Sequence, residues 1–250
     1  LQANPGVDPY VPRAGSVLTI PLQTLLPDAP REGLVLNIAE LRLYYYPPGQ
    51  NSVTVYPIGI GQLGGDTLTP TMVTTVSDKR ANPTWTPTAN IRARYKAMGI
   101  DLPAVVPAGP NNPMGHHAIR LAAYGGVYLL HGTNADFGIG MRVSSGCIRL
   151  RDADIKSLYN KITPGTRVNI INEPIKVSVE PNGTRLVEVH QPLSEHINDD
   201  PQTLPIVLNA GMKNFKQAPQ TNQQVMEYAM ELRSGMPVDV TRHQLPAEQA

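Results

Sequence analysis

The sequence predicts a mainly β protein with a small α+β region at its C-terminal end. Pro (25) and Gly (21) are abundant in 250 residues, which favours short strands joined by turns over long helices. Runs rich in branched and aromatic residues are separated by turn signals along the middle of the chain. Hydrophobic residues make up 41% of the chain, which supports one large domain or two modest ones.

The central region, residues 31–172, is predicted to be rich in strands. Residues 34–46 have the pattern of two strands joined around Ala39-Glu40, and residues 51–60 alternate apolar and polar positions. Two further runs flank Gly125-Gly126 and predict a hairpin whose second strand ends at His131. The strands resume at 166–171.

One helix is predicted after these strands, at residues 152–161. Asp152 is the expected N-cap, and Ile155, Leu158 and Tyr159 fall on one helical face. The turn at 163–165 ends this helix.

Residues 173–250 change character and predict a small accessory domain. A hairpin is expected around Asn182-Gly183. The segment 221–235 has a capping-box pattern from Thr221 to Gln224, with apolar residues at helical spacing after it at Val225, Tyr228, Ala229 and Leu232.

Residues 1–26 have the pattern of the end of a small module. Val17, Leu18 and Ile20 predict a short apolar strand closed by Pro21, and residues 26–33 are predicted to be a linker. The sequence begins at Leu1 without a methionine or signal peptide, so any targeting segment was removed or lies outside it.

Composition argues against several classes of function. The formal net charge is +1 and basic residues form no block, so nucleic acid is not an expected partner. No apolar run is long enough for a membrane span. A single cysteine excludes an intramolecular disulfide framework and a multi-cysteine zinc site.

Two apparent ligand-binding motifs are rejected. The segment "GIGQLG" (59–64) matches G-x-G-x-x-G, but the β-branched sequence after it, broken by Pro70, is a poor helix. A glycine-rich turn is the better interpretation. The histidines at 116, 117, 190, 196 and 243 lack metal-ligand spacing, so we expect neither a metal nor a cofactor.

The single cysteine, Cys147, lies in "SSGCIRL" (144–150). A lone cysteine is more often a core residue than a nucleophile. Here, however, flexible polar residues precede it, Arg149 and Arg151 follow it, and a helix is predicted to begin just beyond. Such surroundings favour a thiolate with a pKa below the ordinary value. Gly146 would admit a carbonyl substrate, with the Gly146 and Cys147 amides as an oxyanion hole.

A nucleophilic thiol needs a base, and His131 is the candidate. It ends a predicted strand just before Gly132, where the chain leaves the sheet, sixteen residues upstream of Cys147. A structural histidine is the ordinary alternative, but the two residues together, each beside a glycine, favour a catalytic pair.

Residues 131–150, "HGTNADFGIGMRVSSGCIRL", resemble the signature of the YkuD-type L,D-transpeptidases, and the likeness extends over roughly 31–172. The chain further resembles the periplasmic ErfK/YbiS/YcfS subgroup. That resemblance implies a β-sandwich-like catalytic domain at 31–172, a truncated LysM-like module at 1–26, a C-terminal domain at 173–250 and a periplasmic location.

The sequence departs from the family pattern at three positions. Ser145 stands where the family usually has a histidine before Gly-Cys, and Arg149 stands where some members have asparagine. Gly132 replaces a serine that orients the first histidine in some members, so only a backbone carbonyl could orient His131.

The resemblance implies a reaction on the tetrapeptide stem of peptidoglycan. Cys147 would attack the carbonyl on the L-centre of meso-diaminopimelate and form a thioester as D-alanine leaves, with His131 carrying the proton. Arg149 is the candidate for a substrate carboxylate, the alternative being an ion pair with Asp152 or Asp154. Ser144 and Ser145 are expected to donate hydrogen bonds near the thiol.

The acceptor implied by the subgroup is the C-terminal lysine of the outer-membrane (Braun) lipoprotein. The alternatives are a 3–3 cross-link between stems, hydrolysis by a cysteine amidase or carboxypeptidase, and a wall-binding module with an inactive site. Carbapenems are the inhibitor class that the family suggests. Because no second cysteine could resolve a sulfenic acid, a periplasmic thiol reductase is a further expected partner.

Overall fold

The computed structural model describes residues 2–8, 11–62, 68–194, 196 and 198–242. The chain divides into two compact units, one formed by residues 30–171 and the other by residues 1–29 together with 172–250. Among the described helices, none is both long enough and apolar enough to cross a membrane.

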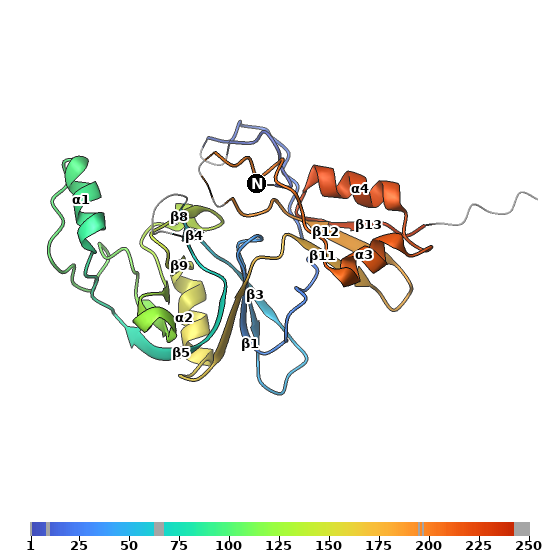
Figure 1. Ribbon diagram of the computed structural model, residues 1–250. Coiled ribbons are helices and arrows are strands. Elements are labelled where there is room, and N and C mark those ends of the chain that lie inside the picture. The colour runs from blue at the N-terminus through green and yellow to red at the C-terminus, as the bar shows by residue number, and fades with distance from the viewer. Residues whose placement is uncertain (1, 9–10, 63–67, 195, 197, 243–250) are drawn as a thin grey trace, which may run out of the picture. The chain divides into compact units, whose positions relative to one another are not determined.

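The larger unit is built on an eight-stranded mixed sheet in the order β3-β2-β1-β10-β5-β6-β7-β9. Figure 1 labels β1, β3, β5 and β9 of this sheet. The pairs β1–β10 and β7–β9 are parallel, and the other neighbours are antiparallel. The strands of this sheet are β1 (Gly33–Asn37), β2 (Arg42–Tyr46), β3 (Thr54–Pro57), β5 (Met72–Ala81), β6 (His117–Leu121), β7 (Leu129–His131), β9 (Ile148–Arg149) and β10 (Arg167–Ile171).

The strands predicted for this region are confirmed. β1 and β2 form a hairpin in which every residue after the first in each strand is buried. β6 and β7 pair on either side of Gly125-Gly126, both of which adopt positive φ angles that suit glycine. A short 3₁₀ turn, η2 (Ala123–Gly126), makes this connection.

The expected sandwich is not what the structure shows. In the described part of residues 30–171, the only strands outside the large sheet are β4 (Ile60–Gly61) and β8 (Arg142–Ser144), which form a two-stranded parallel pair. The unit is therefore a mixed α/β fold with one curled sheet. Alternating patterns identify strands but do not show whether a sheet's second face meets another sheet or a helix.

Helix α2 (Asp152–Lys161) packs against β6 and β7 and buries Ile155 and Leu158, as the helical spacing predicts. The expected N-cap is wrong, because Arg151 occupies that position and Asp152 is the first helical residue. The Asp152 carboxylate instead accepts hydrogen bonds from the backbone amide of His116 and, at 2.8 Å, from its Nδ1.

The remaining elements of the larger unit lie in its connections. They are α1 (Ala89–Ala97), which buries no residue, and the short 3₁₀ turn η3 (Asp136–Gly138). The sequence did not predict α1, although Thr88 caps it by accepting a hydrogen bond from the amide of Ile91.

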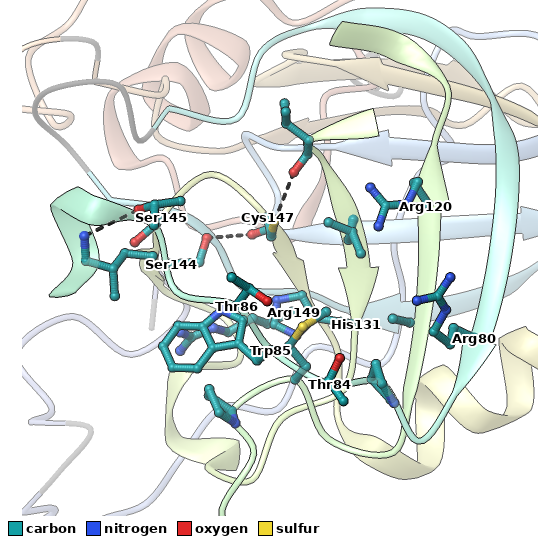
Figure 2. A pocket seen from close by; sticks show the side chains of 18 of the residues that line it. Arg80, Thr84, Trp85, Thr86, Arg120, His131, Ser144, Ser145, Cys147 and Arg149 are labelled. Atoms are coloured by element: carbon teal, nitrogen blue, oxygen red, sulfur yellow. Dashed lines mark hydrogen bonds between the residues drawn. The ribbon is translucent and has the colours of Figure 1, made fainter. Parts of the chain in front are cut away.

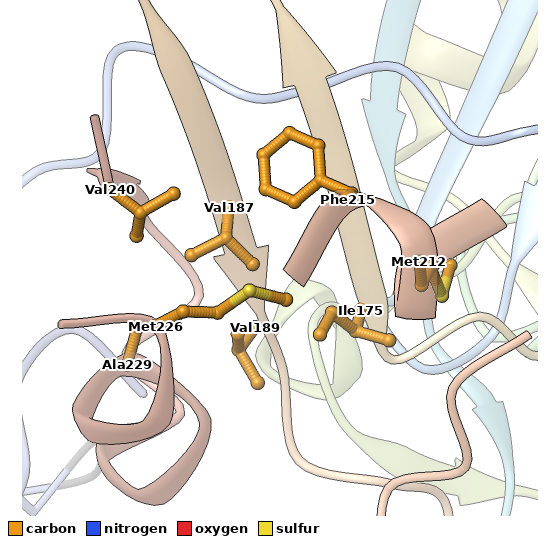
Figure 3. Packing of buried hydrophobic residues seen from close by; sticks show 8 residues of the cluster. All are labelled: Ile175, Val187, Val189, Met212, Phe215, Met226, Ala229 and Val240. Carbon is orange, nitrogen blue, oxygen red and sulfur yellow. The ribbon is translucent and has the colours of Figure 1, made fainter. Parts of the chain in front are cut away.

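The smaller unit contains a three-stranded antiparallel sheet and two helices. Its elements are β11 (Ile175–Val179), β12 (Arg185–Val189), β13 (Pro237–Asp239), α3 (Ala210–Gln217) and α4 (Gln223–Leu232). β11 and β12 form the hairpin expected around Asn182-Gly183. Figure 3 shows the core between sheet and helices, which consists of Ile175, Val187, Val189, Met212, Phe215, Met226, Ala229 and Val240.

The predicted start and buried face of α4 need correction. Asn222, one residue beyond Thr221, is the N-cap and accepts from the amide of Val225. Tyr228 and Leu232 are exposed, whereas Met226 and Ala229 are buried. The sequence spacing fits two adjacent faces of this short helix, and the packing against the sheet selects one.

Residues 2–8 and 11–29 contain no helix or strand, so the strand expected at Val17–Ile20 is wrong. The side chains of Val17 and Ile20 are exposed, which removes the burial that would support a strand. Further along, Thr24 Oγ1 and the amide of Leu25 donate to the buried carboxylate of Glu188, which also pairs with Lys176 Nζ at 3.0 Å. This segment is therefore tied to β12 by a buried charge network.

Candidate active site

A cavity of about 390 Å³ lies over the β5-β6-β7-β9 end of the large sheet and contains both Cys147 and His131. Strand pairing arranges the residues of its floor in two rows. In one row Asp78 pairs with Arg120, Arg120 pairs with Leu129, and Cys147 follows next to Leu129. The other row runs Arg80, Ala118, His131, Arg149. All eight residues line the cavity.

The alternation of side chains along each strand explains why these residues share one face. Leu130 and Ile148 lie between floor residues in sequence and are fully buried on the opposite face. On that face the His117 ring packs at a tilt against the ring of Tyr159 of α2, with centroids 4.9 Å apart. The sheet therefore presents one face to the core and α2, and the other to the cavity.

A β-bulge in β5 turns two charged residues toward the cavity. Val76 pairs with Leu121 and Asp78 pairs with Arg120, so Ser77 is an extra residue in β5. Val76 is buried, and strict alternation from it would direct position 78 toward the core. Beyond the extra residue the side chains alternate in the opposite sense, so Asp78 and Arg80 face the cavity.

The loop that carries Cys147 is held by two hydroxyl groups. The hydroxyl of Ser144, which is buried, donates to the carbonyl oxygen of Cys147 (Figure 2). Thr69 Oγ1 donates to the carbonyl oxygen of Gly146 at 2.9 Å and accepts from the amide of Gly61 at 3.0 Å. Gly146 has a φ of 104°, a conformation that strongly favours glycine. These contacts fix the backbone on both sides of the sulfur.

Gly59 and Gly61 of "GIGQLG" support this loop. Gly59 exchanges two backbone hydrogen bonds with Arg149, each of 2.8 Å. A Cβ atom at Gly59 would lie within van der Waals overlap of the Gly138 carbonyl oxygen, so the chains approach more closely than a side chain allows. Residues 63–67, which include Gly64 of the motif, lie outside the described residues.

The low thiol pKa expected for Cys147 is wrong. Burial raises the pKa of Cys147 above its ordinary value and outweighs the lowering effects of the Leu129 backbone amide and of Arg149 and Arg120. The helix expected to favour a thiolate, α2, packs on the opposite face of the sheet. The thiol is therefore protonated at neutral pH when the site is empty.

His131 is buried and neutral. Burial lowers the pKa of His131 to about 4, against the raising effect of a backbone hydrogen bond to Gly132. The Nδ1 atom lies 2.6 Å from the Gly132 carbonyl oxygen and therefore carries the proton. Nε2 is left as the basic nitrogen. The backbone carbonyl of Gly132 is the orienting group that the absence of a serine at this position predicts.

Close packing around Gly132 fixes this carbonyl. Its amide donates to the carbonyl of His117 at 3.0 Å. A Cβ atom at Gly132 would lie 2.5 Å from an oxygen of the Asp152 carboxylate, and a Cβ atom at Gly115 would lie 2.6 Å from the same oxygen. Glycine at both positions lets Asp152 of α2 approach the strand end that carries His131.

Arg149, Ser144 and Ser145 make different contacts in the structure. The Arg149 side chain lines the cavity, and among the described residues it forms no ion pair with Asp152 or Asp154, the alternative considered for it. Ser145 accepts a 3.4 Å hydrogen bond from Arg94 of α1. Ser144 donates to the backbone oxygen of Cys147 itself, which is the hydrogen bond near the thiol expected of it.

Residues of the segment 83–95 form a wall of the cavity. Trp85 is half-buried and lines the cavity (Figure 2). Ile91 and Tyr95 line it as well. Trp85 also exchanges backbone hydrogen bonds with Val106, of 2.9 and 2.7 Å. This bridge closes the base of the excursion that contains α1.

Several residues of the cavity were missed from the sequence. They are Asp78, Arg80, Arg94 and Arg120. Thr69, which holds the Cys147 loop without lining the cavity, was missed as well. Alternation within "HAIRL" could have placed Arg120 on the same face as Ala118. The bulge and the pairing register that bring Asp78 and Arg80 to Arg120 leave no comparable local signal.

Comparison with known proteins identifies the family. The model of the L,D-transpeptidase catalytic domain matches residues 31–170, and the model of the L,D-transpeptidase C-terminal domain matches residues 174–240. The chain belongs to the YkuD family of L,D-transpeptidases. It is therefore an enzyme of the class that acts on peptidoglycan.

Two relatives of this transpeptidase come from Escherichia coli K12. "Probable L,D-transpeptidase YcfS" is 85% identical over 245 residues, which cover 98% of this chain and 77% of the relative. "Probable L,D-transpeptidase YbiS" is 53% identical over 240 residues, which cover 95% of this chain and 77% of the relative. The crystal structure of L,D-transpeptidase 3 from Mycobacterium tuberculosis aligns with 18% identity and a TM-score of 0.40, covering 58% of this chain and 62% of that one.

Proposed function

We propose that Cys147 and His131 transfer the acyl group of a peptidoglycan tetrapeptide stem through a thioester. The observation that supports this most directly is the presence of both residues in one cavity, with His131 at the end of β7 and Cys147 immediately before β9, which pairs with β7. Membership of the L,D-transpeptidase family supplies the class of substrate.

In the proposed first half-reaction, the neutral thiol and neutral imidazole act together. Nε2 of His131 takes the thiol proton as the sulfur attacks the carbonyl on the L-centre of meso-diaminopimelate. The amides of Gly146 and Cys147 stabilise the oxyanion. The bond to D-alanine then breaks, and the imidazolium returns its proton to the leaving amine.

In the second half-reaction, an acceptor amine attacks the thioester. His131 takes a proton from the amine, the new amide forms, and the departing sulfur is protonated again. No net proton or electron is gained or lost over the cycle. Arg149 is proposed to bind a substrate carboxylate through its guanidinium group.

The acceptor that we propose is the C-terminal lysine of the outer-membrane (Braun) lipoprotein, which places the enzyme in the periplasm. This rests on resemblance to the ErfK/YbiS/YcfS subgroup, with which the chain shares 50–85% identity. We also infer that residues 1–26 are the C-terminal part of a LysM-like module, and that a thiol reductase maintains Cys147.

The acceptor can be tested with disaccharide-tetrapeptide and a lysine-ended peptide in one reaction. The proposal predicts a product in which the lysine amine is joined to diaminopimelate. A product with only diaminopimelate-to-diaminopimelate bonds would establish the 3–3 cross-linking alternative. Free tripeptide as the main product, with amine present, would establish a cysteine amidase or carboxypeptidase.

An inactive wall-binding module is the alternative that is not an enzyme. It predicts that C147A binds sacculi as the unaltered chain does, and that a carbapenem leaves no acyl adduct. The proposed function predicts an adduct that C147A lacks, detectable as a mass increase of the intact protein.

A further inference from the structure

The end of the cavity floor farthest from Cys147 carries three charged residues that the proposed mechanism does not use. Asp78 and Arg80 come from β5, and Arg120 from β6. Figure 2 shows Arg80 and Arg120 together at one side of the cavity. Asp78 and Arg120 are direct cross-strand partners.

Two guanidinium groups and one carboxylate lie together at this end of the cavity. Arg80 Nη2 lies 3.6 Å from an oxygen of Asp78, which is a loose contact between two well-exposed side chains. Arg120 Nη1 donates to the carbonyl oxygen of Gly126 at 2.6 Å, and this bond directs the guanidinium group. Guanidinium groups suit a carboxylate, while the carboxylate of Asp78 suits an ammonium group.

We propose that Asp78, Arg80 and Arg120 bind an amino-acid zwitterion: the ammonium and carboxylate groups at the D-centre of the donor's meso-diaminopimelate side chain. This inference rests on the proposed function, because it takes the donor from it. It adds the residues that distinguish diaminopimelate from lysine at the third position of the stem.

The spacing of the strands fits this assignment. Neighbouring strands are about 4.8 Å apart, so Arg120, two strands from Cys147, begins about 10 Å from it. The three methylene groups of diaminopimelate place its D-centre carboxylate roughly 7–8 Å from the carbonyl that Cys147 attacks, counted from ordinary bond lengths. The long Arg120 side chain spans the difference.

The same spacing excludes the acceptor amine as the group bound here. The acceptor nitrogen must reach the acyl carbon on the sulfur of Cys147. Asp78, three strands away, begins about 15 Å from Cys147, which is too far to hold a reacting amine. A zwitterion at this end of the cavity is therefore a part of the donor that does not react.

The test measures acylation alone, as D-alanine release without an acceptor. Two donors are compared, disaccharide-tetrapeptides with meso-diaminopimelate or with L-lysine at the third position. Lysine keeps the methylene groups and the ammonium group and lacks only the carboxylate. The variants are R80Q, R120Q and D78N, and the matched control is R92Q, since Arg92 is exposed on α1 and does not line the cavity.

The unaltered enzyme should acylate faster with the diaminopimelate donor. R80Q and R120Q should each lower kcat/KM for that donor by about 10- to 100-fold and leave the lysine donor within about twofold. D78N should lower both rates, because both donors carry the ammonium group. R92Q should change neither. R80Q tests the proposal even if R120Q folds poorly, since Arg80 is exposed.

The outcomes separate this inference from the function on which it rests. Equal rates for both donors, or an equal fall for both in R80Q and R120Q, would overturn the zwitterion assignment and leave the transpeptidase intact. If the unaltered enzyme released D-alanine from neither donor, the proposed donor and this inference would both be wrong.

Discussion

Changing the pH tests whether Cys147 and His131 rest as a neutral pair. Burial raises the pKa of Cys147 and lowers the pKa of His131 to about 4. Both shifts disfavour a thiolate–imidazolium ion pair in the empty site. A His131 pKa of about 4, compared with the ordinary histidine value of 6.5, corresponds to about 3 kcal/mol against the imidazolium.

The expected rate profile follows from these directions. Acylation, measured as kcat/KM from initial rates of D-alanine release, should stay level from neutral pH down to about pH 5. It should then fall about tenfold per unit below pH 4, as His131 becomes protonated. Alkylation of Cys147 by iodoacetamide should rise with pH into the alkaline range, because the reagent requires the thiolate.

Two results would refute the reasoning. One is an acid limb of kcat/KM with a midpoint near 6.5 or above, which would mean that His131 titrates as an exposed imidazole. The other is an alkylation rate that is constant from pH 5 to pH 8, which would reveal a stable thiolate. C147A provides the background for both assays.

Stability should depend on pH through the same histidine. The pKa of His131 is lower in the folded protein than in the unfolded chain, so the unfolded state binds more protons between pH 6.5 and about 4. The free energy of unfolding should therefore fall by up to about 3 kcal/mol as pH drops through that window. H131Q should lack this contribution, and an unchanged pH dependence in H131Q would contradict it.

Three substitutions give further tests. G132A should lower kcat/KM for acylation by at least about tenfold, because the added Cβ would displace the Asp152 carboxylate or the Gly132 carbonyl that orients the His131 imidazole. Unchanged acylation by G132A would count against an orienting role for this carbonyl. T69V should lower the free energy of unfolding by about 1–3 kcal/mol and slow acylation, because it leaves the Gly61 amide and the Gly146 carbonyl without their hydrogen-bond partner. Full activity of T69V would show that the conformation of the Cys147 loop does not depend on Thr69. E188Q should destabilise the smaller unit by about 3–5 kcal/mol in denaturant unfolding, because Lys176 would stay buried without its carboxylate; a loss below 1 kcal/mol would mean that the pair contributes little.

The sequence predicted the strands and hairpins because their signals are local. Alternating apolar residues and the Gly125-Gly126 and Asn182-Gly183 turns specify pairing between neighbours in the chain. The sequence also indicated Cys147 and His131 as candidates, because the residues flanking each of them are unusual for a core. These features need no knowledge of how distant strands meet.

Properties that depend on distant strands could not be predicted. The parallel pairing of β7 with β9 sets His131 opposite Arg149, and the bulge at Ser77 turns Asp78 toward Arg120. The thiol pKa was predicted in the wrong direction because neighbouring residues in sequence suggested charge, whereas the fold supplies burial. The burial of Cys147 depends on how the strands assemble around the cavity, which the residues next to it in sequence do not specify.

The most direct test of the account is the mass of the intact enzyme after brief mixing with a diaminopimelate tetrapeptide donor and no acceptor. A thioester on Cys147 predicts a mass increase equal to the donor minus D-alanine, located on the peptide that contains Cys147 and removed by an added amine. Absence of that adduct under conditions in which the donor is consumed, or an adduct on another residue, would contradict it.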